Sequence, residues 1–275
     1  MSIKTNELPQ AAAMADSDSF IVTTAQGTKK TPLSWIRGLF APAPLAKNLT
    51  LYVNATTGND GNDGLTMGTA KQTILGALQS LPSNLGGFTA TIQLYGGTLQ
   101  AATYSVSGTS RLHNGTIVLD GSHMDEDAQI IGTIMIEGSC NWKLQDLAIQ
   151  WTTGLYGAVE IRSTGYARVY NCKIDGVDKT KSGVYLLSFT VSSCIYNTKF
   201  TNCNIAVDTR PALYQDRGSI ICAIGESTGS NNNYGIYSSH ASIIFDRTTE
   251  ALGSVRRVLQ FGGLIVDGSG NFVKE

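Results

Sequence analysis

A repeat with a period of about 25 residues, within the range typical of solenoid proteins, constrains this chain more than any other feature of its sequence. Residues 143–149, 168–174 and 194–200 align with one another, and each segment begins at almost the same distance along the chain from the one before. Ile221 and Ile244 continue the series of their first apolar positions with similar steps. A near-constant period in the twenties, with short strands in each unit, is the signature of a β-solenoid.

A second series of apolar segments runs about half a period out of phase with the first. It consists of residues 159–161, 184–186 and 205–207, so each repeat holds two to three short strands. Ser, Thr and Asn occupy 69 of the 275 positions and Gly another 30, and these residues suit strands and tight turns. We therefore predict an all-β body of about six to eight coils.

One polar residue interrupts each repeat at the same place. Asp146, Asn171 and Asn197 stand where the chain must bend from one sheet to the next. Asparagine tolerates the left-handed conformation, and stacked amides can hydrogen-bond along the solenoid axis. Alternation then predicts an inward column of Leu144, Val169 and Ile195 and an outward column of Gln145, Tyr170 and Tyr196.

The N-terminal end of the solenoid needs a cap, because its first strand would otherwise be a bare edge. Residues 69–72 have the spacing of a capping box, and the apolar residues of 74–81 follow with helical period and end before Pro82. We predict a short capping helix near residues 72–81. The acidic turn at 57–64 lacks the Glu and the flanking helices of a calcium loop, so we predict no metal.

Residues 1–46 form a separate segment, and the β-helix domain spans residues 47–275. Residues 20–23 and 28–31 predict a small hairpin with a Gly turn, followed by at most a short helix at 35–40. With so few apolar anchors, the segment should be stable only against a partner or in an oligomer. The alternative is a flexible tail.

Charge and hydropathy exclude several classes of protein. Twenty Lys and Arg balance 21 Asp and Glu, so the chain lacks the basic footprint of a nucleic-acid-binding protein. The start has no apolar signal-peptide core and no long apolar run occurs, so we expect folding in a cytoplasm without membrane insertion. The five cysteines lack zinc spacing and are interpreted as reduced thiols, and no cofactor is predicted.

Two parts of the chain resemble known families. Residues 52–78 and the Val-Tyr-Asn-Cys-Lys-Ile type of coil resemble right-handed parallel β-helix proteins of the pectate lyase-like class. Residues 8–12, 18–22 and 27–31 resemble the attachment segment of bacteriophage tail fibres and tailspikes, and residues 261–266 resemble the final strand of such fibres.

This resemblance implies a right-handed single-stranded parallel β-helix with an N-terminal attachment segment, assembled as a homotrimer in the virion tail. The segment would dock on the tail or baseplate, and the β-helix would recognise host cell-surface polysaccharide. Because the chain ends at its last coil, we expect a recognition spike or a branch that holds other fibres. The residues assigned to virion attachment are Leu8, Pro9, Phe20, Val22 and Trp35.

The resemblance also implies a glycan site on the outward face of the sheet that holds residues 159–161. There we expect Glu160, Tyr185 and Ala206 to form one exposed column, and Arg162, Leu187 and Asp208 the next. An aromatic face can stack on a sugar while charged groups hold its hydroxyls. The alternative is a solvated sheet with incidental charges.

A polysaccharide depolymerase on the same scaffold is the alternative function, and a free-standing bacterial carbohydrate enzyme is a third. Hydrolysis needs two carboxyl groups about 5 to 9.5 Å apart, and the strand spacing puts Glu160 and Asp208 about 10 Å apart. Asp175 is a further catalytic candidate. Other side chains available to a hydrolase or a lyase are Asp178, Asp216, Lys179, Lys181 and Arg210.

Overall fold

The chain divides into two units, Met1–Ala43 and Pro44–Glu275. The division falls close to the boundary predicted after residue 46. The structure is a computed structural model that describes residues 19–24, 27–32, 43–100, 112–152, 156–163, 165–187, 191–209, 220–239, 242–260 and 262–273.

The first unit contains a two-stranded hairpin. Strands β1 (Ser19–Thr24) and β2 (Gly27–Pro32) pair in antiparallel register, from Thr24 opposite Gly27 to Ser19 opposite Pro32. Gly27 has a φ of 112°, a conformation that favours glycine. The predicted hairpin is confirmed, with Phe20 and Val22 in β1. Leu8, Pro9 and Trp35 lie outside the described residues.

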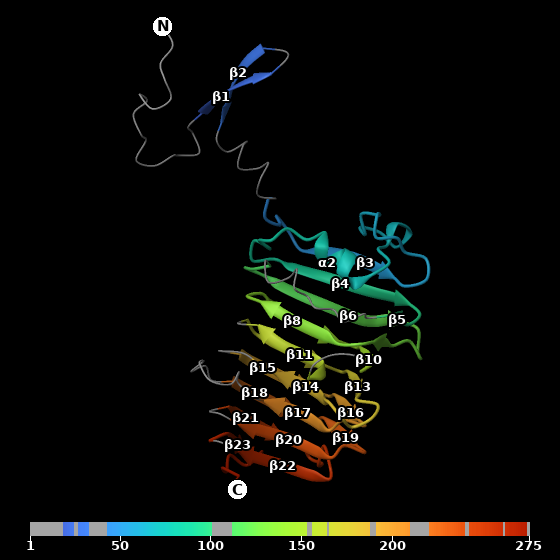
Figure 1. The fold of residues 1–275 in the computed structure, drawn as a ribbon, viewed down its shortest axis with the longest axis vertical. Helices are drawn as coiled ribbons and strands as arrows, with labels where there is room; N and C mark the ends of the chain where they lie inside the picture. Colours follow the sequence, from blue (N-terminus) through green and yellow to red (C-terminus); the bar gives the residue numbers. More distant parts are fainter. Residues whose placement is uncertain are drawn as a thin grey trace. The chain divides into compact units, whose positions relative to one another are not determined.

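The second unit is a parallel β-helix built from three sheets (Figure 1). Sheet 1 contains β3 (Leu49–Asn54), β4 (Thr89–Gly96), β6 (Thr116–Met124), β9 (Asn141–Gln145), β12 (Ala167–Tyr170), β15 (Val191–Tyr196), β18 (Ile220–Gly225), β21 (Ile243–Arg247) and β23 (Leu264–Val266). Sheet 2 contains β5 (Leu99–Gln100), β7 (Ile130–Ile131), β10 (Ala148–Gln150), β13 (Lys173–Asp175), β16 (Lys199–Thr201) and β19 (Thr228–Ser230). Sheet 3 contains β8 (Ile134–Gly138), β11 (Gly157–Ser163), β14 (Ser182–Leu186), β17 (Ile205–Thr209), β20 (Tyr234–Ser239) and β22 (Val255–Gln260).

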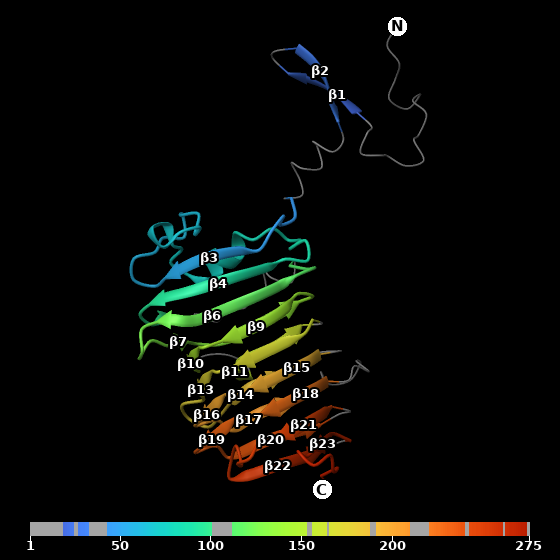
Figure 2. The same ribbon diagram turned by 180° about the vertical axis from the view of Figure 1, so that it is seen from behind.

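In the coils from β6 to β20, the chain passes from sheet 1 to sheet 2 to sheet 3 and then returns to sheet 1. Figure 2 shows sheet 1 from behind, with its strands in chain order from β3 to β23. All neighbouring strands in the three sheets pair in parallel, as in β12 with β9 and β15. With six strands each in sheets 2 and 3, the predicted solenoid and its number of coils are confirmed.

The inward column predicted from the repeat forms the centre of the core. Leu144 pairs with Val169 and Val169 with Ile195 in register, and all three are buried. Because β-strand side chains alternate between faces, their neighbours Tyr170 and Tyr196 point outward. One continuous apolar core therefore runs from coil to coil.

The continuation of this column beyond residue 200 was predicted wrongly. Ile224, not Ile221, pairs with Ile195, because this coil is longer than the two coils before it. Ile221 consequently lies on the outward face and is 42% exposed. Ile244 is buried, but it pairs with Cys222 in the next column.

An ion pair replaces apolar packing in the last coils. Asp246 pairs with Ile224 in sheet 1 and is fully buried, while Arg257 pairs with the buried Ile236 in sheet 3. The Arg257 Nε and Nη2 atoms lie 2.6 and 2.5 Å from one Asp246 carboxylate oxygen, and Thr248 donates to the other. Such bonds are required, since an unpaired buried charge costs several kcal/mol.

A helix covers the N-terminal end of the solenoid, as predicted. Helix α2 (Ile74–Gln79) lies beside β3 in Figure 1 and buries Ile74, Ala77 and Leu78 in the core. Asp60 Oδ1 accepts hydrogen bonds of 2.9 Å from the backbone N–H groups of Gln72 and Thr73 just before the helix. The acidic turn therefore holds the start of the capping helix.

Asparagine side chains form a ladder at the bend between sheets 1 and 2. Asp146, Asn171 and Asn197 have φ values of 56°, 53° and 48°, in the left-handed region. The Asn197 amide donates to Asn171 Oδ1 at 2.9 Å, and the Asn171 amide donates to Asp146 Oδ1. Both the conformation and the amide bonds follow the prediction.

A second ladder, which the sequence analysis missed, lies where sheet 2 ends. The Asn202 amide donates to Asp175 Oδ1 at 2.9 Å, and the Asn231 amide donates to Asn202 Oδ1 at 2.6 Å. Asn202 and Asn231 also have left-handed φ values, 53° and 56°. Both ladders thus begin at a carboxylate and continue through amides, one coil at a time.

Substitution of Asn171 separates the two roles of a ladder residue. We expect Asn171→Ala to lower the free energy of unfolding by about 3 kcal/mol, from left-handed strain and two lost hydrogen bonds. Asn171→Gly should cost about 1 kcal/mol less, because glycine adopts this conformation freely. Urea unfolding measures both, and equal losses for Ala and Gly would contradict the conformational role.

Burial suppresses the reactivity of four of the five cysteines. All five are free thiols, as predicted, and Cys172 occupies the inward position of its coil. Burial raises the pKa of Cys140 to about 11 and the pKa values of Cys172, Cys203 and Cys222 to about 12. Cys194 differs from these four in being only half-buried.

A thiol titration tests this difference. The thiolate is the reactive form, and at pH 8 about a thousandth or less of each raised-pKa thiol is ionised. We expect Ellman's reagent to modify one thiol in the native protein and five in urea. The variant Cys194→Ser should abolish the native reaction, and fast modification of two or more native thiols would contradict the assignment.

Candidate functional site

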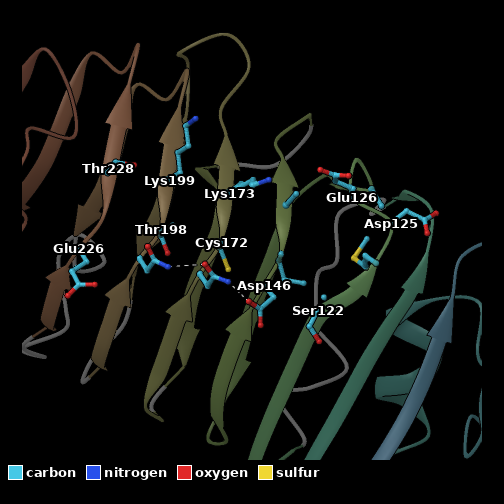
Figure 3. Close-up of a pocket in the computed structure, with 17 residues that line it drawn as sticks. Ser122, Asp125, Glu126, Asp146, Cys172, Lys173, Thr198, Lys199, Glu226 and Thr228 are labelled. Carbon is cyan, nitrogen blue, oxygen red and sulfur yellow. Dashed lines mark hydrogen bonds between the residues drawn. The ribbon is translucent and has the colours of Figure 1, made fainter.

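A groove of about 470 Å³ runs along the bend between sheets 1 and 2. We call it the polar groove. It crosses five successive coils, and its walls combine bend residues with the first residues of the sheet 2 strands (Figure 3). Its charged and polar lining includes the side chains of Asp125, Glu126, Asp146, Asn171, Lys173, Asn197, Lys199, Glu226 and Thr228.

The asparagine ladder makes the wall of the groove rigid. Asn171 and Asn197 are exposed and line the groove, whereas Cys172 and Thr198, the next residues in the chain, are buried beneath them. At the N-terminal end of the groove, Gly121 packs closely against the bend of the next coil. A Cβ atom added to Gly121 would lie only 2.4 Å from the Asp146 carbonyl oxygen. The ladder amides therefore have fixed positions along the groove.

Two lysines stand side by side in the middle of the groove. Lys173 and Lys199 are register partners on β13 and β16, and Thr228 on β19 continues their column. Neighbouring strands lie about 4.8 Å apart, so two ammonium groups project from adjacent coils. Among the described residues, neither lysine forms an ion pair. Their hydrogen-bond donors are therefore available to a ligand.

Carboxylates stand at both ends of this lysine pair. In Figure 3, Asp125 and Glu126 lie on one side of Lys173 and Lys199, and Glu226 lies on the other. Glu226 accepts a hydrogen bond from the Tyr196 hydroxyl, and this bond is the main reason why the pKa of Tyr196 is raised. Along its length the groove thus offers acceptors, amides, ammonium donors and again acceptors.

This arrangement suits a long ligand with many hydroxyl groups. Hydroxyls both donate and accept hydrogen bonds, so they can pair with carboxylates, amides and ammonium groups alike. The part of the chain that the structure describes contains no cluster of His, Cys, Asp and Glu that could hold a metal ion.

The site predicted on sheet 3 is arranged differently from the prediction. Glu160 pairs with Tyr185 and Tyr185 with Asp208, so these three share one column, and Asp208 does not stand beside Arg162. The prediction aligned Tyr185 with Ala206. The coil between Tyr185 and its actual partner, Asp208, is two residues longer than that alignment assumed. A two-residue shift preserves the face of the sheet but changes the column.

The column on sheet 3 is also buried rather than exposed. Glu160 is fully buried, and its Oε1 atom accepts hydrogen bonds from the backbone N–H groups of Tyr156 and Gly157 at 2.9 and 3.4 Å. Arg162 donates to Glu160 Oε2 at 2.9 Å. Both carboxylate oxygens therefore hold the structure of their own strand and its preceding turn.

Tyr185 and Asp208 are likewise occupied within the fold. The Tyr185 ring stacks on the Tyr156 ring with their centres 4.8 Å apart and is only 6% exposed. Asp208 is buried, and its Oδ2 atom accepts a hydrogen bond of 2.9 Å from Ser182. Glu160, Tyr185 and Asp208 consequently have structural roles, and the expected exposed platform is absent from the described part of sheet 3.

Two of the remaining catalytic candidates, Asp175 and Asp178, accept hydrogen bonds from residues near them in the fold. Asp175 Oδ1 begins the second amide ladder and also accepts from the Val177 N–H at 2.9 Å. Asp178 accepts from Thr180, and these bonds lower the pKa of Asp178, which opposes a role as general acid. Asp216 and Arg210 lie outside the described residues.

The signal for the polar groove was present in the aligned repeats. Each repeat places a lysine two residues after its bend asparagine, in Asn171-Cys172-Lys173 and Asn197-Thr198-Lys199. The family resemblance instead placed the glycan site on sheet 3. Recurrence of a charged residue at an outward position of consecutive coils indicates a column, and this column lines the groove.

Comparison of the chain with protein-family models, curated proteins and solved structures finds no match. Within the described residues, no helix has the length and apolar character needed to span a membrane. Function is therefore inferred from the β-helix and from the polar groove.

Proposed function

We propose that this protein recognises cell-surface polysaccharide through the polar groove, as a component of a bacteriophage tail fibre or tailspike. The observation that carries the proposal is the groove itself, which crosses successive coils and repeats its polar groups along the solenoid axis. A polysaccharide is also a repeating polar chain, so one type of contact can recur from coil to coil.

Each element of the groove has a counterpart in such a ligand. The amides of Asn171 and Asn197 and the ammonium groups of Lys173 and Lys199 supply donors to sugar oxygens. Because the ladder fixes the amides before binding, little conformational entropy is lost there when a ligand binds. Weak contacts over several coils can then add up to a specific affinity.

The virion role is proposed for the N-terminal unit. An isolated two-stranded hairpin is at best marginally stable in water, so β1 and β2 favour a segment that folds against a partner. We propose that residues 1–46 dock on the tail or baseplate, with Leu8, Pro9, Phe20, Val22 and Trp35 as contacts. The protein would then be assembled in the host cytoplasm and act in the virion.

Binding of purified polysaccharides to groove variants tests the proposal. Against a panel of bacterial capsular and O-antigen polysaccharides, we expect Lys173→Ala/Lys199→Ala to weaken binding about tenfold or more, because charged hydrogen bonds contribute about 1.5 to 3 kcal/mol each. Biolayer interferometry measures the affinity. The matched control Lys47→Ala/Lys179→Ala removes two lysines outside the groove and should bind like the unmodified protein.

Three other results have defined meanings. Retention of no polysaccharide on the panel would contradict the proposed function. Equal loss in both lysine variants would show that the groove is not the site. Shortening of a bound polymer, followed by size-exclusion chromatography, would replace recognition by the depolymerase alternative.

We propose self-association, as a trimer, through the outward face of sheet 1 in its last three strands. Here six apolar side chains lie in two register columns, and three of them, Ile221, Phe245 and Leu264, are between 36 and 42% exposed. Contiguous exposed apolar surface of this kind marks an interaction site. This apolar patch consists of Ile221, Ala223, Ile243, Phe245, Leu264 and Val266.

A charge in the apolar patch should prevent this association. We expect Phe245→Asp to convert a trimer into a monomer, because burying an unpaired carboxylate at an interface is strongly unfavourable. Light scattering during size-exclusion chromatography measures the mass. Leu65→Asp changes another exposed apolar residue, outside the patch, and should leave the mass unchanged. A Phe245→Asp protein with the mass of the unmodified protein would contradict the proposed interface.

A further inference from the structure

Two tyrosines form an aromatic surface on sheet 1, on the other side of the asparagine ladder from the polar groove. Tyr170 and Tyr196 are register partners at the ends of β12 and β15. Their rings are parallel within 4°, with centres 5.7 Å apart, and Tyr170 is 42% exposed. The exposed part of the Tyr170 ring, which the Tyr196 ring and the Lys143 ammonium leave uncovered, can contact the C–H groups of a sugar ring.

One cation lies over the Tyr170 ring, and a second lies over the ring of a third tyrosine, Tyr166. The Lys143 ammonium is 5.7 Å from the centre of the Tyr170 ring, and the Arg168 guanidinium is 4.8 Å from the centre of the Tyr166 ring. Lys143 and Arg168 are themselves register partners, so two positive charges stand on adjacent strands. Like charges in this position repel each other.

Within the described part of the chain, no carboxylate forms an ion pair with either cation. Glu226, an acidic residue of the polar groove, is hydrogen-bonded to the Tyr196 hydroxyl instead. The repulsion between Lys143 and Arg168 is therefore not compensated by an ion pair within the described fold. An anionic group placed between them would relieve it.

There is space for a ligand at this position. A pocket of about 170 Å³ is lined by Lys143, Arg168, Tyr170 and Tyr196, together with Val169 and Cys194. We call these six residues the tyrosine platform. In contrast to the polar groove, which has carboxylates at both ends, the tyrosine platform is lined by cations and no acidic side chain.

We propose that the tyrosine platform binds an acidic sugar residue of the recognised polysaccharide. The sugar ring would pack against the exposed part of the Tyr170 ring, and its carboxylate would pair with Lys143 and Arg168. This inference rests on the proposed function, because it names the chemical class of the polymer that the groove binds. The short connection Tyr170-Asn171-Cys172-Lys173 brings both sites to the same coil, so one polymer can reach them together.

A matched pair of ligands tests the proposal. The affinity for uronic-acid-containing capsular polysaccharides is measured before and after treatment with carbodiimide and borohydride. This treatment converts the carboxylates to alcohols and leaves the polysaccharide chain intact. We expect carboxyl reduction to weaken binding to the unmodified protein at least tenfold. The variant Lys143→Gln/Arg168→Gln should bind both forms equally, with the affinity of the reduced form.

A variant of the polar groove serves as the control. Lys173→Ala/Lys199→Ala should bind both polymers more weakly while it keeps the difference between the acidic and the reduced form. The mass of every variant is measured by light scattering, because a change in oligomeric state in Lys143→Gln/Arg168→Gln would make the platform an interface between copies and overturn the proposal.

The remaining outcomes separate this inference from the proposed function. If Lys143→Gln/Arg168→Gln keeps full discrimination between acidic and reduced polymers, the tyrosine platform is not the acidic subsite. If the unmodified protein binds only neutral polysaccharides, the inference fails while the proposed function stands. If it binds neither kind, the proposed function fails and this inference fails with it.

Discussion

The left-handed residue at the bend between sheets 1 and 2 is the constraint on which the rest of the structure depends. The chain turns there within one residue, and asparagine is among the few side chains that accept this conformation at small cost. The amides of Asn171 and Asn197 then bond to the coil before them, so each bend is aligned with its predecessor. A register slip would break the ladder as well as the strand pairing. Backbone conformation, amide bonding and sheet register therefore support the same arrangement.

The same bend also places the residues available for function. A strand alternates its side chains between two faces, so the outward positions on either side of each bend asparagine belong to different sheets. Tyr170 precedes Asn171 and lies on sheet 1, whereas Lys173 follows it by two positions and lies on sheet 2. The tyrosine platform and the polar groove are thus two sides of one repeated corner. The platform presents tyrosines and cations, whereas the groove presents amides, lysines and carboxylates, because different residues occupy the outward positions on the two sides of the corner.

Much of the fold could be predicted from residues 143–200, where successive coils of almost equal length repeat one pattern of inward and outward positions. The prediction failed where the coil length changes, because a single sequence does not show which residues pair across a coil of a different length. Asp208 and Ile221 were misplaced for this reason.

Glu160 shows a different limit of prediction from sequence. Alternation assigns its face correctly, but it cannot show that the backbone of Tyr156 and Gly157 turns back to bond with the carboxylate.

Buried charges and exposed charges in the coils are treated differently, and this difference supports the corner as the proposed binding surface. Where a charge is buried, the fold satisfies it: Asp246 receives Arg257, and Glu160 receives Arg162 and two backbone N–H groups. A buried charge without such partners would cost several kcal/mol.

An exposed cation needs no such partner, because water solvates it at little cost. Of the cations on either side of the ladder, Arg168, Lys173 and Lys199 are exposed and Lys143 is half-buried, so all four are in contact with water. Stability does not require them to be adjacent in pairs, since adjacent like charges repel. A ligand that carries oxygen acceptors, some of them anionic, turns that repulsion into binding energy.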